Sequence, residues 1–335
     1  MREFEHGGDI YRNSVRLDFS VNTNPLGISE KVKNAVLSSA NCFDVYPDME
    51  YTSLRNAIAE HEGVSVKNVV CSNGAAEMIF AVVRAVMPKR ALLIAPTFSE
   101  YERALISVGC EIEYYTLTEE NGFCIKSNFP ERLSGIDMVF ICNPNNPTGS
   151  IAEKTMMEKT AQICDENNIV CVVDECFMDL AHGYSMKGIL PVIKAFTKTY
   201  AMAGLRLGYM IGDTKLCGDI KKQLPAWNVS AAALSAGLAA VSDEEYLIKS
   251  REIIKAEREY LSTELKMLGF KVFKSETNFM LIKGARGIGK ALLDREILIR
   301  CCDNFRGLEG SFYRIAVKKH EENAELIREL GDICG

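Results

Sequence analysis

Three short apolar runs constrain the fold of this chain more than any other feature of its sequence. They lie at 92–95, 138–142 and 169–173, and a stretch with helical character, 154–167, separates the last two. Short apolar strands that alternate with helices indicate a mostly parallel sheet covered by helices. Ligands of such sheets bind beyond the carboxyl ends of the strands. The sequence therefore predicts an α/β fold with its functional site at that edge of the sheet.

Composition narrows the class of protein further. The chain has 335 residues, 47% of them hydrophobic, which is enough for a large core in two domains. Its net charge of −6 argues against a broad nucleic-acid footprint and favours a small-molecule partner. No apolar run reaches the ~20 residues that a membrane-spanning helix needs, so we expect no membrane partner.

The cysteine content and the first residues of the chain indicate the cellular compartment. The chain contains twelve cysteines, but its first residues form no apolar signal region, so we expect reduced thiols and a cytoplasmic protein. No Cys-x-x-Cys pair is present, which argues against a zinc site.

Candidate ligand-binding side chains follow each of the three apolar runs. Phe98 follows the first run, and a core aromatic is the alternative interpretation. Asn146 follows the second in Asn-Pro-Asn-Asn-Pro-Thr-Gly, where prolines and glycine stiffen the loop and fix the amide as a donor. A structural turn would use the same residue types. Asp174 ends the third run, where a buried carboxylate needs a cationic partner unless it only caps a helix.

A lysine and an arginine stand out in 195–209, a run otherwise without charge. Desolvation and nearby cations lower the pKa of a lysine, and the neutral amine of Lys198 could then attack an aldehyde. Arg206 offers a planar fork suited to a phosphate. A snorkelling surface lysine and an ion-paired arginine are the alternatives. Together the two residues predict a ligand that carries both an aldehyde and a phosphate.

A second phosphate signal lies nearer the N-terminus. Residues 69–77 have the pattern of a strand, a glycine turn and the start of a helix. Such a turn leaves the backbone N–H groups of Gly74, Ala75 and Ala76 available to an anion. Strand-glycine-helix turns occur throughout α/β proteins, so this pattern is weak by itself.

In this order, the motifs resemble those of the fold-type I pyridoxal 5'-phosphate (PLP) enzymes, the aspartate aminotransferase superfamily, over residues 6–317. The resemblance implies a large domain with a mostly parallel, helix-covered sheet and a smaller α+β C-terminal domain. It implies that PLP forms a Schiff base with Lys198. It also implies that Asp174 pairs with the protonated ring nitrogen and so makes the ring an electron sink.

The resemblance assigns further cofactor contacts. Phe98 would stack on the pyridine ring, and Asn146 would donate to its O3' oxygen. The phosphate ligands would be Gly74, Ala75, Ala76, Thr197 and Arg206. Tyr46, in a Tyr-Pro-Asp turn, would reach the phosphate bound by a neighbouring subunit, which implies a homodimer with sites at the interface. A turn tyrosine half buried against the core is the alternative.

Two positions depart from the superfamily pattern. Phe177 stands where many relatives carry a tyrosine that donates to O3'. Ala195 stands where many carry a serine or threonine that binds the phosphate, a loss that Thr197 would have to offset.

The domain limits follow from the same resemblance. We expect residues 1–40 to form an N-terminal arm and a helix that pack with the small domain, 41–240 to form the large domain, and 241–335 to form the small domain. Within the last, 284–291 nearly matches a phosphate-binding loop of nucleotide-binding proteins. Ala291 lacks the hydroxyl that binds Mg²⁺, so we interpret this segment as a tight strand-to-helix connection.

The N-terminus and the C-terminal strands resemble one subgroup, the threonine-phosphate decarboxylases of cobalamin biosynthesis. The shared segments are His-Gly-Gly at 6–8, Asp-Phe-Ser-Val-Asn-Thr-Asn-Pro-Leu-Gly at 18–27 and Ile-Leu-Ile-Arg at 297–300. The implied substrate-binding residues are His6, Gly7, Asn24, Arg300 and Arg314. Arg314 would bind the α-carboxylate and Arg300 the substrate phosphate, with a structural salt bridge as the alternative for either arginine.

The resemblance implies decarboxylation of L-threonine O-3-phosphate to aminopropanol phosphate. A PLP-dependent aminotransferase of the histidinol-phosphate type is the alternative, because both reactions need a phosphate pocket. A non-catalytic protein that binds PLP is a third possibility, against which the complete set of Lys198, Asp174 and Arg206 counts.

Overall fold

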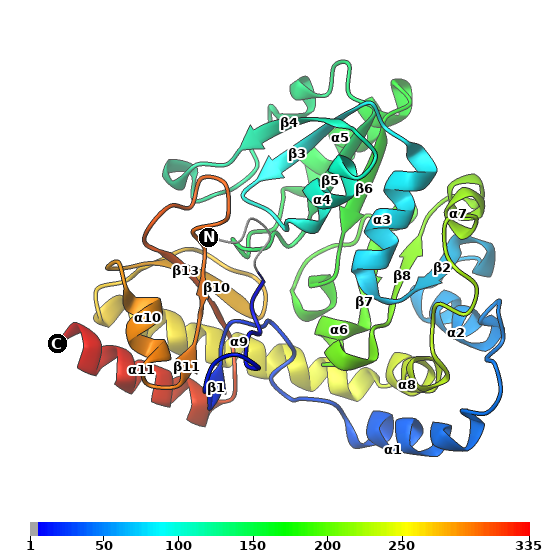
Figure 1. The fold of residues 1–335 in the computed structure, drawn as a ribbon. Coiled ribbons are helices and arrows are strands. Elements are labelled where there is room, and N and C mark those ends of the chain that lie inside the picture. Colours follow the sequence, from blue (N-terminus) through cyan, green and yellow to red (C-terminus); the bar gives the residue numbers. More distant parts are fainter. Residues whose placement is uncertain (1–5) are drawn as a thin grey trace.

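A seven-stranded sheet dominates the computed structural model, which describes residues 6–335 (Figure 1). Its strand order is β2-β8-β7-β6-β5-β3-β4, and β8 runs antiparallel to its neighbours while the other pairings are parallel. The strands are β2 (Val69–Ser72), β3 (Arg90–Ala95), β4 (Glu111–Thr116), β5 (Met138–Cys142), β6 (Val170–Asp174), β7 (Val192–Ala195) and β8 (Gly208–Ile211). The predicted α/β architecture is therefore confirmed.

Helices cover both faces of this sheet. Successive side chains of a strand point to opposite faces, and because both sets are apolar here, both faces must be buried. Leu92 and Ile94 pack on the face covered by α2, α5 and α8, whereas Ala91 and Leu93 pack on the face covered by α3, α4 and α7. The bounds are α2 (Thr52–Glu62), α3 (Gly74–Val86), α4 (Glu100–Ile106), α5 (Lys154–Glu166), α7 (Thr214–Lys221) and α8 (Ala231–Val241). The short helix α6 (Phe196–Thr199) continues directly from β7.

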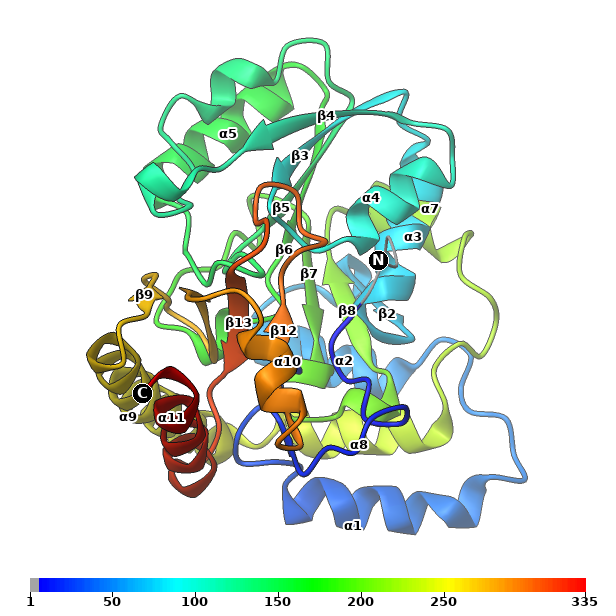
Figure 2. The same ribbon diagram turned by 60° about the vertical axis from the view of Figure 1, so that its left-hand side comes forward.

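The long helix α9 (Glu244–Met267) leads from the large sheet to a smaller one (Figure 2). The smaller sheet is antiparallel, in the order β12-β13-β10-β9. Its parts are β9 (Lys271–Val272), β10 (Phe279–Lys283), α10 (Ile288–Leu293), β12 (Arg300–Cys301), β13 (Phe312–Ala316) and α11 (His320–Cys334). A separate core that includes Leu261, Met280 and Ile315 holds this region together.

The connection from β10 to α10 is the tight strand-to-helix link that the sequence predicts. Gly284 follows β10, and a Cβ at this position would lie 2.5 Å from the ring of Phe270. Gly287 precedes α10 in a left-handed conformation with φ +88°. Both positions therefore require glycine for packing or backbone geometry rather than for phosphate binding.

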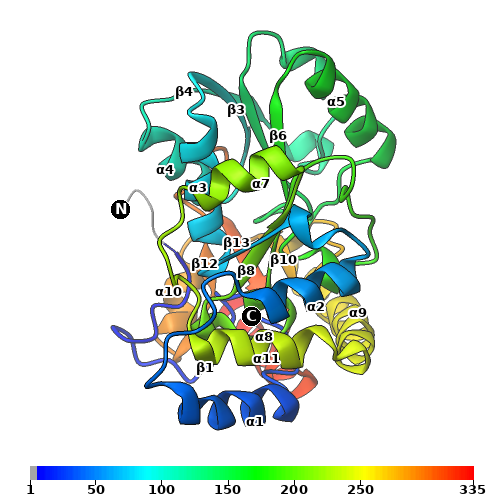
Figure 3. The same cartoon turned by 90° about the vertical axis from the view of Figure 1, so that its right-hand side faces the viewer.

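The N-terminal segment joins both parts of the molecule, and its helix corrects one prediction. Strand β1 (Leu17–Asp18) pairs with β11 (Ile297–Leu298) beside the small sheet. Helix α1 (Glu30–Ser39), which begins at the N-cap Ser29, instead packs along α8 of the large domain (Figure 3). The prediction that this helix packs with the small domain is wrong, because α1 packs on α8 and its Val32 is buried in the same cluster as Ala233 and Ala236 of that helix.

Two findings concern the chain as a whole. The twelve cysteines all lie within residues 6–335, and none of them forms a disulfide. None of the helices in this part of the chain has the length and hydropathy that crossing a bilayer requires.

Candidate active site

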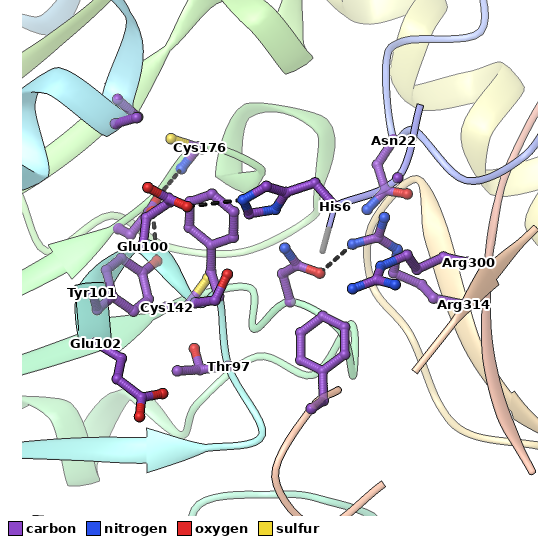
Figure 4. A pocket seen from close by; sticks show the side chains of 18 of the residues that line it. His6, Asn22, Thr97, Glu100, Tyr101, Glu102, Cys142, Cys176, Arg300 and Arg314 are labelled. Carbon is purple, nitrogen blue, oxygen red and sulfur yellow. Dashed lines mark hydrogen bonds and ion pairs between the residues drawn. The ribbon is translucent and has the colours of Figure 1, made fainter. Parts of the chain in front are cut away.

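A cavity of about 730 Å³ lies between the carboxyl ends of the large-domain strands and the small sheet (Figure 4). The N-terminal segment, the loop after β3, the end of β6 and the strands β12 and β13 all contribute side chains to it. The sequence-predicted residues that line it are His6, Gly7, Ala75, Ala76, Phe98, Asn146, Asp174, Thr197, Lys198, Arg206, Arg300 and Arg314. The cavity thus lies where an open parallel sheet normally binds its ligand.

Lys198 enters the cavity from α6, whose other side chains hold the helix in the core. Phe196, Thr197 and Thr199 are buried, and Lys198 projects from the same short turn toward the cavity. Burial, together with the charges of Arg314 and Arg206, lowers the pKa of Lys198 to about 8. No carboxylate of residues 6–335 forms an ion pair with its Nζ. A substantial fraction of this amine is therefore neutral near physiological pH.

Asp174 ends β6 with a buried carboxylate that contacts neutral donors. The hydroxyl of Tyr101 donates to Oδ2 at 2.6 Å, and the backbone N–H of Cys176 donates to Oδ1 at 3.0 Å. Within the described chain, no lysine, arginine or histidine pairs with it at salt-bridge distance. A buried anion without a cation is costly, so this position suits a cationic group of a ligand.

The start of α3 and the side chain of Arg206 form a second polar corner of the cavity. Gly74 has φ +78°, and a Cβ there would lie 2.5 Å from Nη2 of Arg206. A Cβ on Gly208 would likewise lie 2.8 Å from the backbone nitrogen of Ala75. The two glycines therefore allow the guanidinium and the β8 backbone to approach the first N–H groups of a 13-residue helix, an arrangement that suits a phosphate.

Thr197 is the threonine that the sequence predicts as a further phosphate ligand. Thr197 lines the cavity, whereas Ala195 is buried in the core at the end of β7. Phe177 also lines the cavity and packs on Phe279 with ring centroids 4.9 Å apart. The cavity wall is thus apolar at this position.

The asparagine-rich loop after β5 is held by its own side chains. Asn143 accepts from the N–H of Ala152, and Asn145 donates to the carbonyl of Pro96. These contacts leave Asn146 facing the cavity, where its Oδ1 accepts a hydrogen bond from Arg314. The predicted stiffness of the loop therefore has a specific origin in two buried amides.

Arg314 and Arg300 lie side by side on β13 and β12, directly opposite each other in the antiparallel register (Figure 4). Arg314 is buried and donates to Asn146 and to the carbonyl of Ser20, and its Nε has no partner among the described residues. Burial lowers its pKa to about 10, and the charge of Arg300 acts in the same direction. Two adjacent guanidiniums, of which that of Arg314 has no carboxylate partner at salt-bridge distance within residues 6–335, create a strong site for an anion.

The N-terminal segment closes the other side of the cavity. His6 Nε2 lies 2.8 Å from Glu100 Oε1, and its ring lies against Phe98 with centroids 5.8 Å apart. Gly7 fits against the backbone of Ser20, because a Cβ at Gly7 would come 2.4 Å from that carbonyl oxygen. The glycine is therefore needed for the segment to reach the cavity.

Gly74 begins α3 next to the lining residue Ala75 but does not itself line the cavity. Two further predicted site residues also lie outside the cavity, and one of them corrects an assignment. Asn24 is buried away from it: its Nδ2 donates to the carbonyl of Thr199 and to the hydroxyl of Ser250, which anchors the N-terminal segment to α6 and α9. Asn22 lines the cavity instead, and its Oδ1 has no partner among the described residues. The two asparagines share one motif, and only their long-range contacts distinguish them.

Tyr46 is the second such residue. It is 76% exposed and packs on Trp227 with ring centroids 4.6 Å apart, on the surface of the large domain. The alternative of a half-buried turn tyrosine is therefore wrong. Within one chain, Tyr46 does not reach the cavity.

The family follows from the comparisons. Residues 15–330 match the model of the family described as aminotransferase class I and II, and the chain belongs to this family. The chain is therefore an enzyme of a family that depends on PLP.

Particular relatives point to two activities. The chain is 33% identical to a threonine-phosphate decarboxylase of Salmonella typhimurium, over 98% of this chain and 96% of the relative. It is 32% identical to a histidinol-phosphate aminotransferase of Methanosarcina mazei, over 92% of this chain and 85% of the relative. The crystal structure of a histidinol-phosphate aminotransferase from Clostridium acetobutylicum is similar with a TM-score of 0.89 and 30% identity, covering 95% of this chain and 99% of the other.

Proposed function

We propose that the cavity binds PLP with its aldehyde at Lys198, its protonated ring nitrogen at Asp174 and its phosphate at the start of α3. The donor set supports this: a lysine with no carboxylate partner and a buried carboxylate with no cation, within the described chain, face one cavity. The phosphate would be bound by the backbone of Gly74, Ala75 and Ala76, by Thr197 and by Arg206. When bound, PLP supplies an electron sink for the bonds of the substrate's Cα.

Two ring contacts complete the proposed cofactor site. Phe98 lines the cavity after β3 and would stack on one face of the pyridine ring. Asn146 would donate its amide to the ring O3', since its Oδ1 is already engaged by Arg314. The wall at Phe177 offers no hydroxyl, so Asn146 would be the donor on that side.

The reaction that this site supports best is decarboxylation of L-threonine O-3-phosphate to aminopropanol phosphate, a step of cobalamin biosynthesis. The observation that carries it is the pair of adjacent guanidiniums, because the substrate has two anionic groups, a carboxylate and a phosphate. Arg314 would bind the carboxylate, and Arg300 with His6 and the backbone of Gly7 would bind the phosphate. The relative of Salmonella typhimurium, similar along nearly its whole length, supports the same substrate.

The residues would act by orientation and proton transfer. Arg314 would hold and orient the carboxylate that leaves as CO₂, and the electron pair of the broken Cα–carboxylate bond would pass to bound PLP. Lys198 Nζ would return a proton to Cα. Because Arg314 also stabilises the bound substrate, orientation must contribute more than binding strength.

The alternative is amino transfer of the histidinol-phosphate type, which the relative of Methanosarcina mazei favours. In that case Lys198 Nζ would remove the proton from Cα. The amino group then passes to a keto acid instead of CO₂ being released.

The assay that separates the two uses the purified, PLP-loaded protein. We expect L-threonine O-3-phosphate to yield CO₂ and aminopropanol phosphate in equal amounts, with no dependence on an added keto acid. Keto-acid-dependent amino transfer from histidinol phosphate, without CO₂ from threonine phosphate, would contradict the decarboxylase and establish the aminotransferase.

The assembly belongs to the same proposal. Tyr46 is exposed beside Phe43, Val45, Met49 and Trp227, an apolar group on one surface of the large domain. A second copy of the chain would cover this surface and place Tyr46 at the phosphate of its partner's site, so the enzyme would be a homodimer. Free thiols throughout the described chain accord with the reducing cytoplasm.

A further inference from the structure

The hydroxyl of Tyr101 makes a contact with Asp174 that neither the proposed cofactor contacts nor the substrate contacts require. Its donor-acceptor distance to Oδ2 is 2.6 Å, and both side chains are buried. The backbone N–H of Cys176 occupies the other oxygen at 3.0 Å (Figure 4). Each oxygen of the carboxylate therefore has one donor, and together the two donors fix its plane.

The ring of Tyr101 is held in place independently of this hydrogen bond. It is fully buried and stacks on Phe140 of β5, with centroids 4.9 Å apart and an angle of 9° between the planes. Its edge also meets Phe98, at 5.7 Å and 83°. A rigid ring presents its hydroxyl in one position, which is what a residue that orients another must do.

The hydroxyl is also a donor that stays protonated. Burial raises the pKa of Tyr101 well above its ordinary value, and the neighbouring charge of Asp174 raises it further. The hydroxyl therefore donates to the Asp174 carboxylate and does not lose its own proton to it.

We propose that Tyr101 is a positioning residue for the cofactor: it holds the Asp174 carboxylate oriented toward the ring nitrogen of PLP. The proposal rests on the proposed binding of PLP and adds to it a residue that acts only through Asp174. Phe98 contacts the ring of Tyr101. The two aromatic residues would therefore position both the ring that stacks on the cofactor and the carboxylate that pairs with its nitrogen.

The test compares four full-length proteins: wild type, Y101F, D174N and the double variant Y101F/D174N. Y101F keeps the ring that stacks on Phe140, so the fold should be retained, as circular dichroism of the cofactor-free proteins would verify. The PLP dissociation constant is measured by equilibrium dialysis, and the absorbance spectrum of bound PLP is recorded. Y184F is the matched control, because the Tyr184 hydroxyl donates to the carbonyl of Ala152 outside the cavity.

We expect Y101F to raise the dissociation constant about tenfold, as the loss of one charge-assisted hydrogen bond implies. Its spectrum should change in the same direction as that of D174N and by less. The double variant should match D174N within about twofold, because Tyr101 would have no effect once Asp174 has lost its charge. In turnover, Y101F should lower kcat and leave KM within about twofold of wild type.

Three outcomes would contradict the proposed role of Tyr101, and a fourth would contradict the binding of PLP itself. A Y101F protein with the dissociation constant and spectrum of wild type would overturn the role of Tyr101. Additive effects of Y101F and D174N, or an equal effect of Y184F, would show a merely structural contribution of the hydroxyl and would also overturn it. A wild-type protein that binds no PLP would instead overturn the proposed function on which the inference rests.

Discussion

Lys194, in strand β7, and Lys198, in α6, are close together in the chain, and the structure surrounds them in opposite ways. The Nζ of Lys194 lies 2.7 Å from a carboxylate oxygen of Glu62 and 2.7 Å from one of Asp179. Burial alone would lower the pKa of Lys194, but these two carboxylates outweigh it and raise the pKa. Lys198 is buried too, but the charges of Arg314 and Arg206 act in the same direction as burial, and its pKa falls to about 8.

The difference teaches that burial does not by itself make a lysine reactive. Burial lowers the pKa of both amines, and at Lys194 the two carboxylates reverse the sign of the shift. Lys194, with a hydrogen-bonded network that also includes Tyr209 and Lys187 around Glu62, is a structural cation. At Lys198 no carboxylate of the described residues forms an ion pair that would reverse the effect of burial, and this keeps the amine available for chemistry.

The largest effect should come from replacing Lys198 by methionine. The variant should lose product formation by a factor of ~10³ or more, because no other amine of the cavity occupies that position. Its far-ultraviolet circular dichroism should match that of wild type. Retention of more than a few per cent of the turnover, measured as CO₂ release, would show that the reaction proceeds without this amine.

The same variant should be more stable than wild type when PLP is absent. Lys198 has a folded-state pKa of about 8, against an ordinary value of 10.5. The unfolded chain therefore binds more protons between these two values, so stability rises with pH across that window. The stabilising effect of K198M should be full below pH 8 and fade toward pH 10.5. Thermal unfolding of both proteins at pH 7 and pH 10 checks this sign.

Replacing Lys194 by methionine should have the opposite effect on stability. The change leaves Glu62 and Asp179 without their shared cation in a buried site, which typically costs about 3–5 kcal/mol. Lys187 and Tyr209 still contact Glu62, so the lower end of this range is expected. Urea unfolding at pH 7 of K194M beside K198M gives the comparison directly. Equal stability of the two variants would remove the distinction between the two lysines.

The sequence predicts the large sheet well because its strands are encoded by local patterns. The runs at 138–142 and 169–173 match β5 and β6 within one residue, and the side chains at their ends line one cavity. Parallel strands bring their carboxyl ends to one edge, so the order of motifs along the chain is enough to place Asn146 and Asp174 together.

What the sequence does not predict depends on partners far away along the chain. Nothing local distinguishes Asn22 from Asn24, because contacts with Thr199 and Ser250 draw one of them away from the cavity. Tyr101 lies 73 residues from Asp174, and a tyrosine after a proline-containing loop carries no signal of that contact. The side on which α1 packs is likewise decided by the complementary surface of α8 and not by its own sequence.

The smallest predicted effect on stability concerns Glu175. This residue and its neighbour Asp174 differ in the same way as the two lysines, one facing the cavity and the other held in the core. Asp174 faces the cavity, whereas Glu175 is fully buried and accepts hydrogen bonds from Ser185 and from the N–H of Met186. Burial raises the pKa of Glu175 to about 7, although these donors and the charge of Lys194 oppose the shift. The folded protein therefore holds a proton here that the unfolded chain has already lost above its ordinary pKa of 4.5.

It follows that the contribution of Glu175 to stability falls as pH rises from 4.5 to 7 and stays low above pH 7. Glu175→Gln should therefore exceed wild type in stability by about 1–2 kcal/mol at pH 8 and lose this advantage near pH 4.5. Urea unfolding at both pH values measures the difference. In the K194M background the advantage at pH 8 should grow, because the cation that helps to ionise Glu175 is gone. An unchanged advantage would mean that the charge of Lys194 acts only on Glu62 and Asp179.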